Sequence, residues 1–327
     1  MAAYLIRRIA YAVLVLLGVN IFTFVLFFSV NSPDDMARLN IGGKRVTAEQ
    51  ISQWRAERGY QKPLYFNPAR SGMAQLTDTI FADRSVSLLL LQFGRADGDA
   101  GGDIGYEIRS RMPASLALAL PTFLLTLGLS VGFALFLVYL RNSAIDFWGV
   151  VLCVVLLSIS SLFYIIVGQF LFAKTLRLLP VSGFAAGLAG LKFLILPVLL
   201  AVLARLGGDA RLNRALFLEE IAKDYVRTAR AKGLTERLIL LRHVLRNALI
   251  PILTSAGAYL PYIFMGSLVF ESFFGIPGLG SYVIDAIGGQ DFAIVRVMVF
   301  IGSLLYITSY LMIDILYSLV DPRVRLA

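Results

Sequence analysis

The chain has 327 residues, of which 58% are hydrophobic and only 16% are charged, and its formal net charge is +9. Because a soluble globular domain carries about 25% charged residues, this composition indicates a membrane protein. The positive charge does not indicate a nucleic-acid partner, because ten Lys and Arg are concentrated between Arg205 and Arg246, where five Asp and Glu are interspersed.

Six apolar segments are predicted to cross a membrane as helices. Four of them are free of charge over 22 to 29 residues. At about 1.5 Å per helical residue, each is long enough for a hydrocarbon core of about 30 Å. The other two are less regular, because ionisable residues lie at or near their ends. The expected spans are Ile9–Val30, Met112–Leu140, Phe147–Ala173, Leu188–Ala204, Asn247–Phe270 and Val297–Ile313. The sequence therefore predicts an all-α membrane protein with six transmembrane helices.

The basic residues near the ends of these spans predict the orientation of the chain. Arg7 and Arg8 precede the first span, and the basic cluster follows the fourth. The positive-inside rule therefore places both termini and this cluster in the cytoplasm. We expect three parts: the N-terminus with an uncleaved first span (1–30), a periplasmic insert between the first two spans (31–111), and a core of five spans (112–327). The core contains a cytoplasmic loop at 205–247.

This cytoplasmic loop is predicted to form two short helices around a break. Leu218–Lys232 reads as the first helix, and Gly233 can adopt the positive φ that a helix end often needs. Thr235 can cap the second helix. One helical face of that second helix is apolar, with leucines at i, i+4, i+7 and i+11: Leu234, Leu238, Leu241 and Leu245. Such a loop can lie on the anionic lipid surface or insert into a partner protein, and composition alone favours neither.

The segments Asp224–Leu234 and Leu241–Pro251 closely resemble the EAA-type loop of permease subunits in bacterial dipeptide and oligopeptide ABC importers. In that family the loop forms the coupling helix, which sits in a groove of the ATPase subunit. The strict pattern has Glu where this chain has Arg227, and the peptide-importer version commonly lacks that Glu. The resemblance implies ATPase contacts along Tyr225, Arg227, Thr228, Ala229, Arg230, Ala231, Lys232, Gly233 and Leu234. The basic members of this set either pair with acidic groups on the ATPase or remain solvated.

A second stretch, Glu271–Gly280, resembles the external re-entrant segment that follows the fifth span in the same family. Its glycines and proline break a helix and permit close approach of the backbone. The carboxylate of Glu271 either contacts substrate or binding protein, or pairs with a neighbouring Arg. Polar side chains of the third span face a substrate path or pack against other helices. The candidates for this path are Glu271, Phe274, Pro277, Gly278, Gly280, Ser161 and Tyr164.

The resemblance runs from Tyr4–Arg8 to the C-terminus and is weakest between residues 31 and 102. It implies the type I ABC importer permease fold in the bacterial inner membrane, and transport of di- or oligopeptides or peptide-like compounds by alternating access. The implied partners are a second homologous permease subunit, two ATP-binding subunits and a periplasmic substrate-binding protein. The chain contains no G-x-x-x-x-G-K-[ST] motif, so we expect ATP and Mg to bind the partners and no cofactor to bind this chain.

Three other functions compete with peptide import as interpretations of this sequence. Members of the same family carry nickel, metallophore complexes or other non-peptide solutes. An ATP-independent secondary transporter also accounts for six spans, although the sequence shows no obvious inverted repeat. An enzyme is not expected, because the single Cys153 and single His243 offer neither a metal cluster nor a Ser-His-Asp set.

Overall fold

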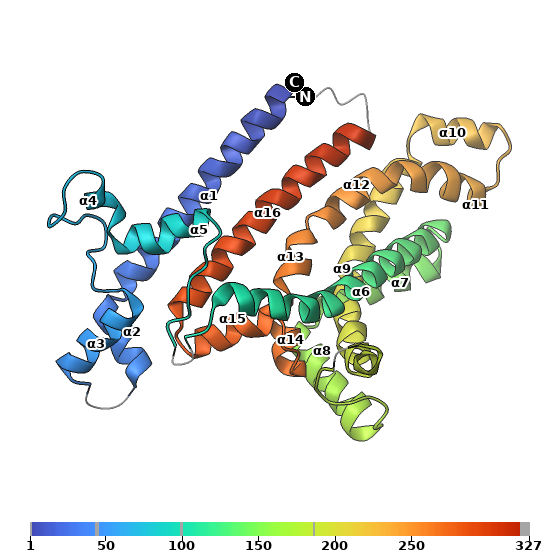
Figure 1. Cartoon of the computed structure of the whole chain (residues 1–327). Helices are drawn as coiled ribbons and strands as arrows, with labels where there is room; N and C mark the ends of the chain where they lie inside the picture. Colours follow the sequence, from blue (N-terminus) through green and yellow to red (C-terminus); the bar gives the residue numbers. More distant parts are fainter. Residues whose placement is uncertain (1, 43–45, 99–100, 186, 321–327) are drawn as a thin grey trace. The chain divides into compact units, whose positions relative to one another are not determined.

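The computed structural model describes residues 2–42, 46–98, 101–185 and 187–320, with the side chains of these residues except 2–5, 188 and 314–320. This part of the chain is helical, apart from turns, loops and one isolated bridge between Arg95 and Asp103. It divides into two compact units (Figure 1). The first contains residues 2–112 and 282–308, and the second contains residues 113–281 and 309–320.

The first unit is built on the long helix α1 (Ala2–Val30). Short helices follow it in the same unit: α2 (Pro33–Ile41), α3 (Ala48–Arg58), α4 (Ala74–Thr77), the π-helical turn η1 (Ala82–Val86), which contacts α1, and α5 (Ser87–Leu89). Ser32 and Thr47 start α2 and α3, each with a reciprocal capping box. The core of this unit joins Phe24 and Phe28 of α1 to Trp54 and other buried side chains. Residues 31–98 therefore contain a folded segment whose apolar core is shared with α1.

The second unit contains most of the remaining helices. They are α6 (Ile104–Tyr139), α7 (Ala144–Ser158), α8 (Ser161–Gly168), η2 (Gln169–Thr175), η3 (Leu188–Gly190), α9 (Leu191–Ile221), α10 (Asp224–Ala231), α11 (Glu236–Leu238), η4 (Ile239–Val244), α12 (Leu245–Gly257), α13 (Leu260–Met265), α14 (Leu268–Phe274), α15 (Leu279–Gly288) and α16 (Phe292–Val320). Of these, α6, α15 and α16 contribute residues to both units. The helices α7 and α9 pack closely at Gly207, where a Cβ atom would collide with the carbonyl oxygen of Cys153. Small residues allow this close packing of apolar helices.

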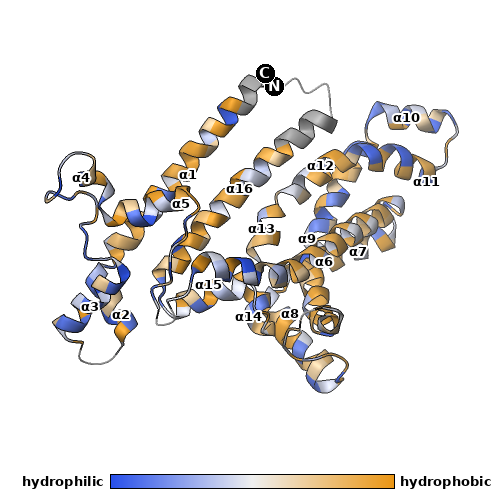
Figure 2. Ribbon diagram, viewed as in Figure 1, coloured by the Kyte–Doolittle hydropathy of each residue, from blue (hydrophilic) through white to orange (hydrophobic). Residues whose placement is uncertain are grey.

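Five described helices are long and apolar enough to cross a membrane. They cover Ile6–Val30, Ile104–Tyr139, Leu191–Ile221, Glu236–Met265 and Phe292–Ile313. A sixth crossing results if α7 and the helix that follows it, which are bent by 90°, form one span. Figure 2 shows the long helices as predominantly hydrophobic and α10 as predominantly hydrophilic. The expectation of an all-α protein with several apolar spans is confirmed.

Two expected spans differ from the helices observed. The continuous helix predicted over Phe147–Ala173 is wrong, because the chain breaks at Ile159 and Ser160. The Ser160 hydroxyl accepts a hydrogen bond from the Phe163 N–H and starts a new helix, which is how serine competes with a helix interior. The fifth span does not reach Phe270, because Gly266 adopts φ +75° and ends α13 at Met265.

The fourth helix is longer than its apolar run. It continues beyond Ala204 to Ile221, so the first part of the predicted loop 205–247 is helical. Arg205 therefore lies inside a long helix, with its side chain in the second unit.

Candidate functional site

The short helix α10 is amphipathic, and its apolar face is buried in the chain itself. Val226 is fully buried and Ala229 is 5% exposed, in a cluster with side chains of α6, α9, η4 and α12. Because residues three apart share one face of a helix, the two anchor α10 by the same side. The opposite side carries exposed residues: Asp224, Arg227, Thr228, Ala231 and Lys232. Ala229, predicted among the contact residues, thus packs inward, and Leu234 is half-buried against the same cluster.

Gly233 forms the turn between α10 and the next helix. Its φ is +78°, in the left-handed region, and its N–H donates to the carbonyl oxygen of Arg230 at 2.9 Å. A Cβ atom at this position would meet nothing within 4 Å. Glycine is therefore favoured here by the backbone conformation rather than by lack of space. Thr235 occupies the expected N-cap position with extended backbone, but its side chain makes no capping hydrogen bond.

Polar contacts within the loop fix this turn. The Arg230 guanidinium binds Glu236 through two contacts, Nε to Oε1 at 2.6 Å and one terminal nitrogen to Oε2 at 3.2 Å. These contacts hold the pKa of the Glu236 carboxyl below its usual value. The Tyr225 hydroxyl donates to Glu220 at 2.7 Å, and burial raises the pKa of Tyr225 to about 12. Arg230 and Tyr225 are thus engaged within the chain, whereas Arg227 and Lys232 remain on the exposed side.

The apolar face predicted from four leucines is buried only in part: Leu234 and Leu245 are half-buried against the cluster, and the two leucines between them are not. Leu238 and Leu241 are 41% and 53% exposed, and Ile239, Leu240 and Val244 are buried instead. The reason is that Ile239–Val244 forms the π-helical turn η4, in which hydrogen bonds join residues five apart. A spacing rule based on 3.6 residues per turn therefore fails at Leu238 and Leu241, just before and within this turn.

A second site surrounds the carboxylate of Glu271 in α14, which is fully buried. Its Oε1 accepts a hydrogen bond from the Ser267 N–H at 3.1 Å. Its Oε2 accepts from the N–H groups of Gly280 and Ser281, at 2.6 and 3.1 Å, in the first turn of α15. Burial raises the pKa of Glu271, and these donors oppose that shift. Among the residues that the structure describes no arginine pairs with Glu271, whose oxygens instead accept from backbone N–H groups.

Three glycines make room for this carboxylate, and we call the arrangement the glutamate clasp: Glu271 with Gly266, Gly278 and Gly280. A Cβ atom on Gly266 or Gly278 would overlap a carboxylate oxygen, and one on Gly280 would approach Oε2 to 2.9 Å. The Leu279 N–H donates to the Ser115 hydroxyl at 2.7 Å and so ties the segment to α6. Of the other candidates, Phe274 is buried and stacked on Phe270, whereas Pro277 is exposed.

A cavity of about 500 Å³ opens within the second unit, lined by residues of α6, α8, α9, α13 and α14. Ser161, a candidate for the substrate path, is among its lining residues. Tyr164 instead donates its hydroxyl to the Leu156 carbonyl oxygen at 2.9 Å, across the break in the third span. Arg205 also lines the cavity, with its guanidinium 3.8 Å from the centre of the Tyr259 ring. Arg205 was not among the predicted path residues because it was expected in a loop, although an ionisable residue next to an apolar run is itself a signal.

Comparisons with known proteins cover nearly the whole chain. A family model described as "Binding-protein-dependent transport system inner membrane component" matches residues 115–326, and a model of the N-terminal part of such membrane components matches residues 1–89. The chain is 33% identical to a putative peptide transport system permease protein of Brucella abortus, over 99% of each chain. It is 30% identical to the oligopeptide transport system permease protein AppB of Bacillus subtilis, over 99% of this chain and 100% of that protein. It is also 30% identical to the glutathione transport system permease protein GsiC of Salmonella paratyphi A, over 99% of each chain.

Proposed function

The chain belongs to the family of inner membrane components of binding-protein-dependent transport systems, and on that basis we propose that it imports peptides as one permease subunit of an ATP-driven importer. Membership implies partners that bind substrate and partners that hydrolyse ATP. Similar proteins are named for the transport of peptides, oligopeptides and glutathione. These names support di- or oligopeptides, or peptide-like compounds, as the substrate class.

For the topology we propose six crossings with both termini in the cytoplasm, as in the type I importer fold. Five apolar helices, together with the bent pair Ala144–Ser158 and Ser161–Thr175 taken as one span, support this number. The basic residues near the span ends support the orientation. Residues 31–111 then form a periplasmic insert between the first span (1–30) and the core (112–327), and α10 lies in the cytoplasm within the loop 205–247.

For the mechanism we propose that α10 is the coupling helix of this subunit. The observation that carries this proposal is that α10 buries Val226 and Ala229 in its own chain while Arg227, Thr228 and Lys232 stay exposed. A force that the ATPase exerts on the exposed face of α10 is transmitted to α6, α9 and α12, because these helices pack on the same cluster. The transporter would contain a second homologous permease subunit and two ATPases, which bind ATP and Mg, and a periplasmic binding protein would deliver the substrate.

The coupling role is tested by the substitution Gly233→Pro. Proline fixes φ near −65°, so it cannot adopt the +78° that this turn requires. We expect normal amounts of protein in the membrane, but loss of peptide uptake and of the ATPase stimulation that substrate-loaded binding protein normally causes. Gly233→Ala should have a smaller effect, because a positive φ costs a non-glycine residue about 1–2 kcal/mol and a Cβ atom meets no neighbour.

Gly18→Ala is a matched control, because Gly18 lies in α1 with ordinary helical backbone and open space around it. It should leave both uptake and ATPase stimulation unchanged. Normal uptake by a membrane-inserted Gly233→Pro variant would refute the coupling assignment.

Substrate class is tested separately, by uptake of labelled peptides in cells that lack this chain. Unimpaired peptide uptake in those cells would remove the peptide assignment and leave the membership in the transport family intact.

A further inference from the structure

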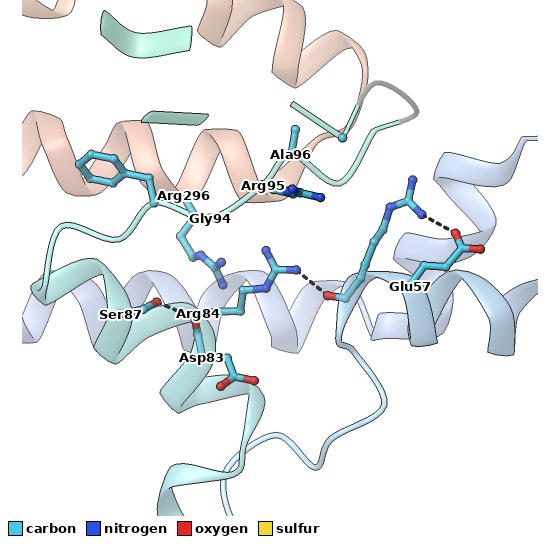
Figure 3. Close-up of a pocket in the computed structure, with 11 residues that line it drawn as sticks. Glu57, Asp83, Arg84, Ser87, Gly94, Arg95, Ala96 and Arg296 are labelled. Atoms are coloured by element: carbon cyan, nitrogen blue, oxygen red, sulfur yellow. Dashed lines mark hydrogen bonds and ion pairs between the residues drawn. The ribbon is translucent and has the colours of Figure 1, made fainter. Parts of the chain in front are cut away.

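A cavity lined by arginines lies within the first unit, apart from the residues to which we assign coupling or transport. Its volume is about 360 Å³. Four arginines from four different elements border it: Arg58 at the end of α3, Arg84 in η1, Arg95 in the loop after α5, and Arg296 in α16. Figure 3 shows Arg84, Arg95 and Arg296 entering the same space from separate segments. Two carboxylates, Glu57 and Asp83, also border the cavity.

The acidic side chains around the cavity already have partners. Asp83 pairs with Lys62 at 2.6 Å, and Glu57 lies 3.5 Å from a terminal nitrogen of Arg58. The buried carboxylate of Asp97 lies 3.6 Å from Arg84 and accepts a hydrogen bond from the Tyr60 hydroxyl at 2.8 Å. Among the described residues neither Arg95 nor Arg296 forms an ion pair within 4 Å, and the nearby carboxylate that acts on Arg296, Asp97, is shared with Arg84.

The guanidinium groups at the inner end of the cavity are held in place by backbone oxygens. Arg58 donates from Nε to the carbonyl oxygen of Asp97 at 2.7 Å, and Arg84 donates to the carbonyl oxygen of Arg58 at 2.7 Å. Both are also supported by aromatic rings, with Arg58 4.9 Å from the centre of Trp54 and Arg84 4.7 Å from the centre of Tyr60. Two of the four cations are therefore fixed before any ligand arrives.

Arg296 is the arginine of this cavity with a buried side-chain nitrogen that has no hydrogen-bond partner among the described residues. It is only 4% exposed, and among the described residues its Nε has no hydrogen-bond partner. A buried ionised group without compensating hydrogen bonds is costly, and a guanidinium is well suited to hold an oxyanion through paired N–H groups. Arg95 is exposed at the mouth of the same cavity. An incoming anion would meet Arg95 first and could then reach Arg296.

We propose that this cavity binds an oxyanion of the phosphate class, held by Arg95 and Arg296 with Arg58 and Arg84 behind them. A tetrahedral phosphate presents acceptor oxygens in several directions, which suits guanidinium groups that enter from four elements. A carboxylate presents its oxygens in one plane and would satisfy fewer of them. A volume of about 360 Å³ also leaves room for a group attached to the phosphate, so the source is either free phosphate or the headgroup of a phospholipid.

One wall of the cavity is tied to a candidate membrane span. The Asn20 side-chain amide of α1 donates to the carbonyl oxygen of Ser85 in η1 at 2.8 Å. Asn20 lies ten residues before the end of α1, which corresponds to about 15 Å along a candidate membrane span. After α5, Leu90 and Leu91 are 68% and 57% exposed. These two apolar side chains follow Arg84 by six and seven residues in the chain and are suited to contact lipid tails.

The experiment uses the complete transporter complex with Arg95→Gln as the main variant. Arg38→Gln is the matched control, because Arg38 is an exposed arginine on α2 outside the cavity. In the first arm, inorganic phosphate is titrated into detergent-solubilised, delipidated complex while the thermal denaturation midpoint is followed. We expect a saturable rise for the wild type and for Arg38→Gln, and an apparent Kd at least ten-fold higher for Arg95→Gln. Sodium acetate at equal concentration should give no saturable rise.

In the second arm, complexes are extracted from nanodiscs of phosphatidylglycerol and bound lipid is counted by native mass spectrometry. Retention of a lipid by the wild type and by Arg38→Gln, with loss in Arg95→Gln, identifies a phospholipid as the source. A response to inorganic phosphate without retained lipid identifies free phosphate. Arg296→Lys is a second variant, which keeps the charge but removes the Nε donor, and it should weaken binding as Arg95→Gln does.

The proposal is overturned if the wild type shows neither a saturable phosphate response nor a retained lipid. It is equally overturned if both variants bind like the wild type, or if acetate binds as tightly as phosphate. Because both arms measure binding and not uptake, their outcome does not depend on the proposed import of peptides.

Discussion

Removal of the Glu271 carboxylate tests whether the glutamate clasp holds α14 and α15 together. The substitution Glu271→Ala leaves the N–H groups of Ser267, Gly280 and Ser281 without their acceptor. Each buried donor that loses its partner lowers the free energy of unfolding by about 1–3 kcal/mol, so three donors together lower it by about 3–9 kcal/mol. Glu271→Gln keeps the size of the side chain and one acceptor oxygen. The NH₂ group of the glutamine then faces a backbone N–H donor, so we expect the free energy of unfolding to fall by roughly 1–3 kcal/mol.

The order of stability should therefore be wild type, then Glu271→Gln, then Glu271→Ala. The assay is the thermal denaturation midpoint of the purified complex, combined with limited proteolysis between α14 and α15. We expect cleavage near the exposed Pro277 to accelerate in the alanine variant. Glu219→Ala is the control, because Glu219 is an exposed glutamate on α9, and it should change neither measurement.

The same reasoning predicts the behaviour of Gly278→Ala. A Cβ atom there would overlap the Glu271 carboxylate and approach the Ser115 hydroxyl to 2.5 Å, so this variant should be unstable although Gly278 has no positive φ. In a Glu271→Ala background the collision with the carboxylate is gone, and Gly278→Ala should cost less than in the wild type. A Glu271→Ala protein within about 1 kcal/mol of the wild type, a small effect for a core substitution, would refute the reasoning, since it would mean that the three N–H groups find other acceptors.

Two further variants test the loop and the packing of the spans. Glu236→Gln should loosen the turn at Gly233, seen as faster amide hydrogen exchange there; unchanged exchange would contradict a role for the Arg230–Glu236 pair. Because the pKa of Glu236 is lowered from its usual value of 4.5, the pair stabilises the turn above that pH, and its contribution is lost as the pH falls through the lowered pKa. Gly207→Val should lower the thermal midpoint by forcing α7 away from α9. Gly208→Ala is its control, because a Cβ atom there would meet only a leucine side chain at 3.4 Å; equal effects of the two variants would argue against close packing at Gly207.

Some features of this protein followed from local sequence. Long apolar runs predict helices that can cross a membrane, because backbone hydrogen bonds within a helix are local and the length of the run sets the span. The positive φ at Gly233 was also predictable, since glycine adopts this conformation more readily than other residues. The resemblance of Asp224–Pro251 to a coupling loop identified the family before any contact was known.

Other features depended on contacts between segments far apart in the chain. The sequence did not reveal that Val226 and Ala229 face inward, because the cluster that buries them includes side chains of α6, which lies about ninety residues earlier. It also misplaced Arg205 and the leucine face around Leu241, because a helix end and a π-helical turn are set by tertiary packing.

Glu271 shows the difference most clearly. Its charge and the neighbouring glycines are visible in the sequence and suggested an ion pair or a substrate contact. Only the tertiary structure shows that the chain folds back so that the carboxylate meets the N–H groups of Gly280 and Ser281, while Ser115, 164 residues before Leu279, closes the other side. Composition determines which segments enter the membrane, but the partner of a buried polar group is decided by which backbone the fold brings beside it.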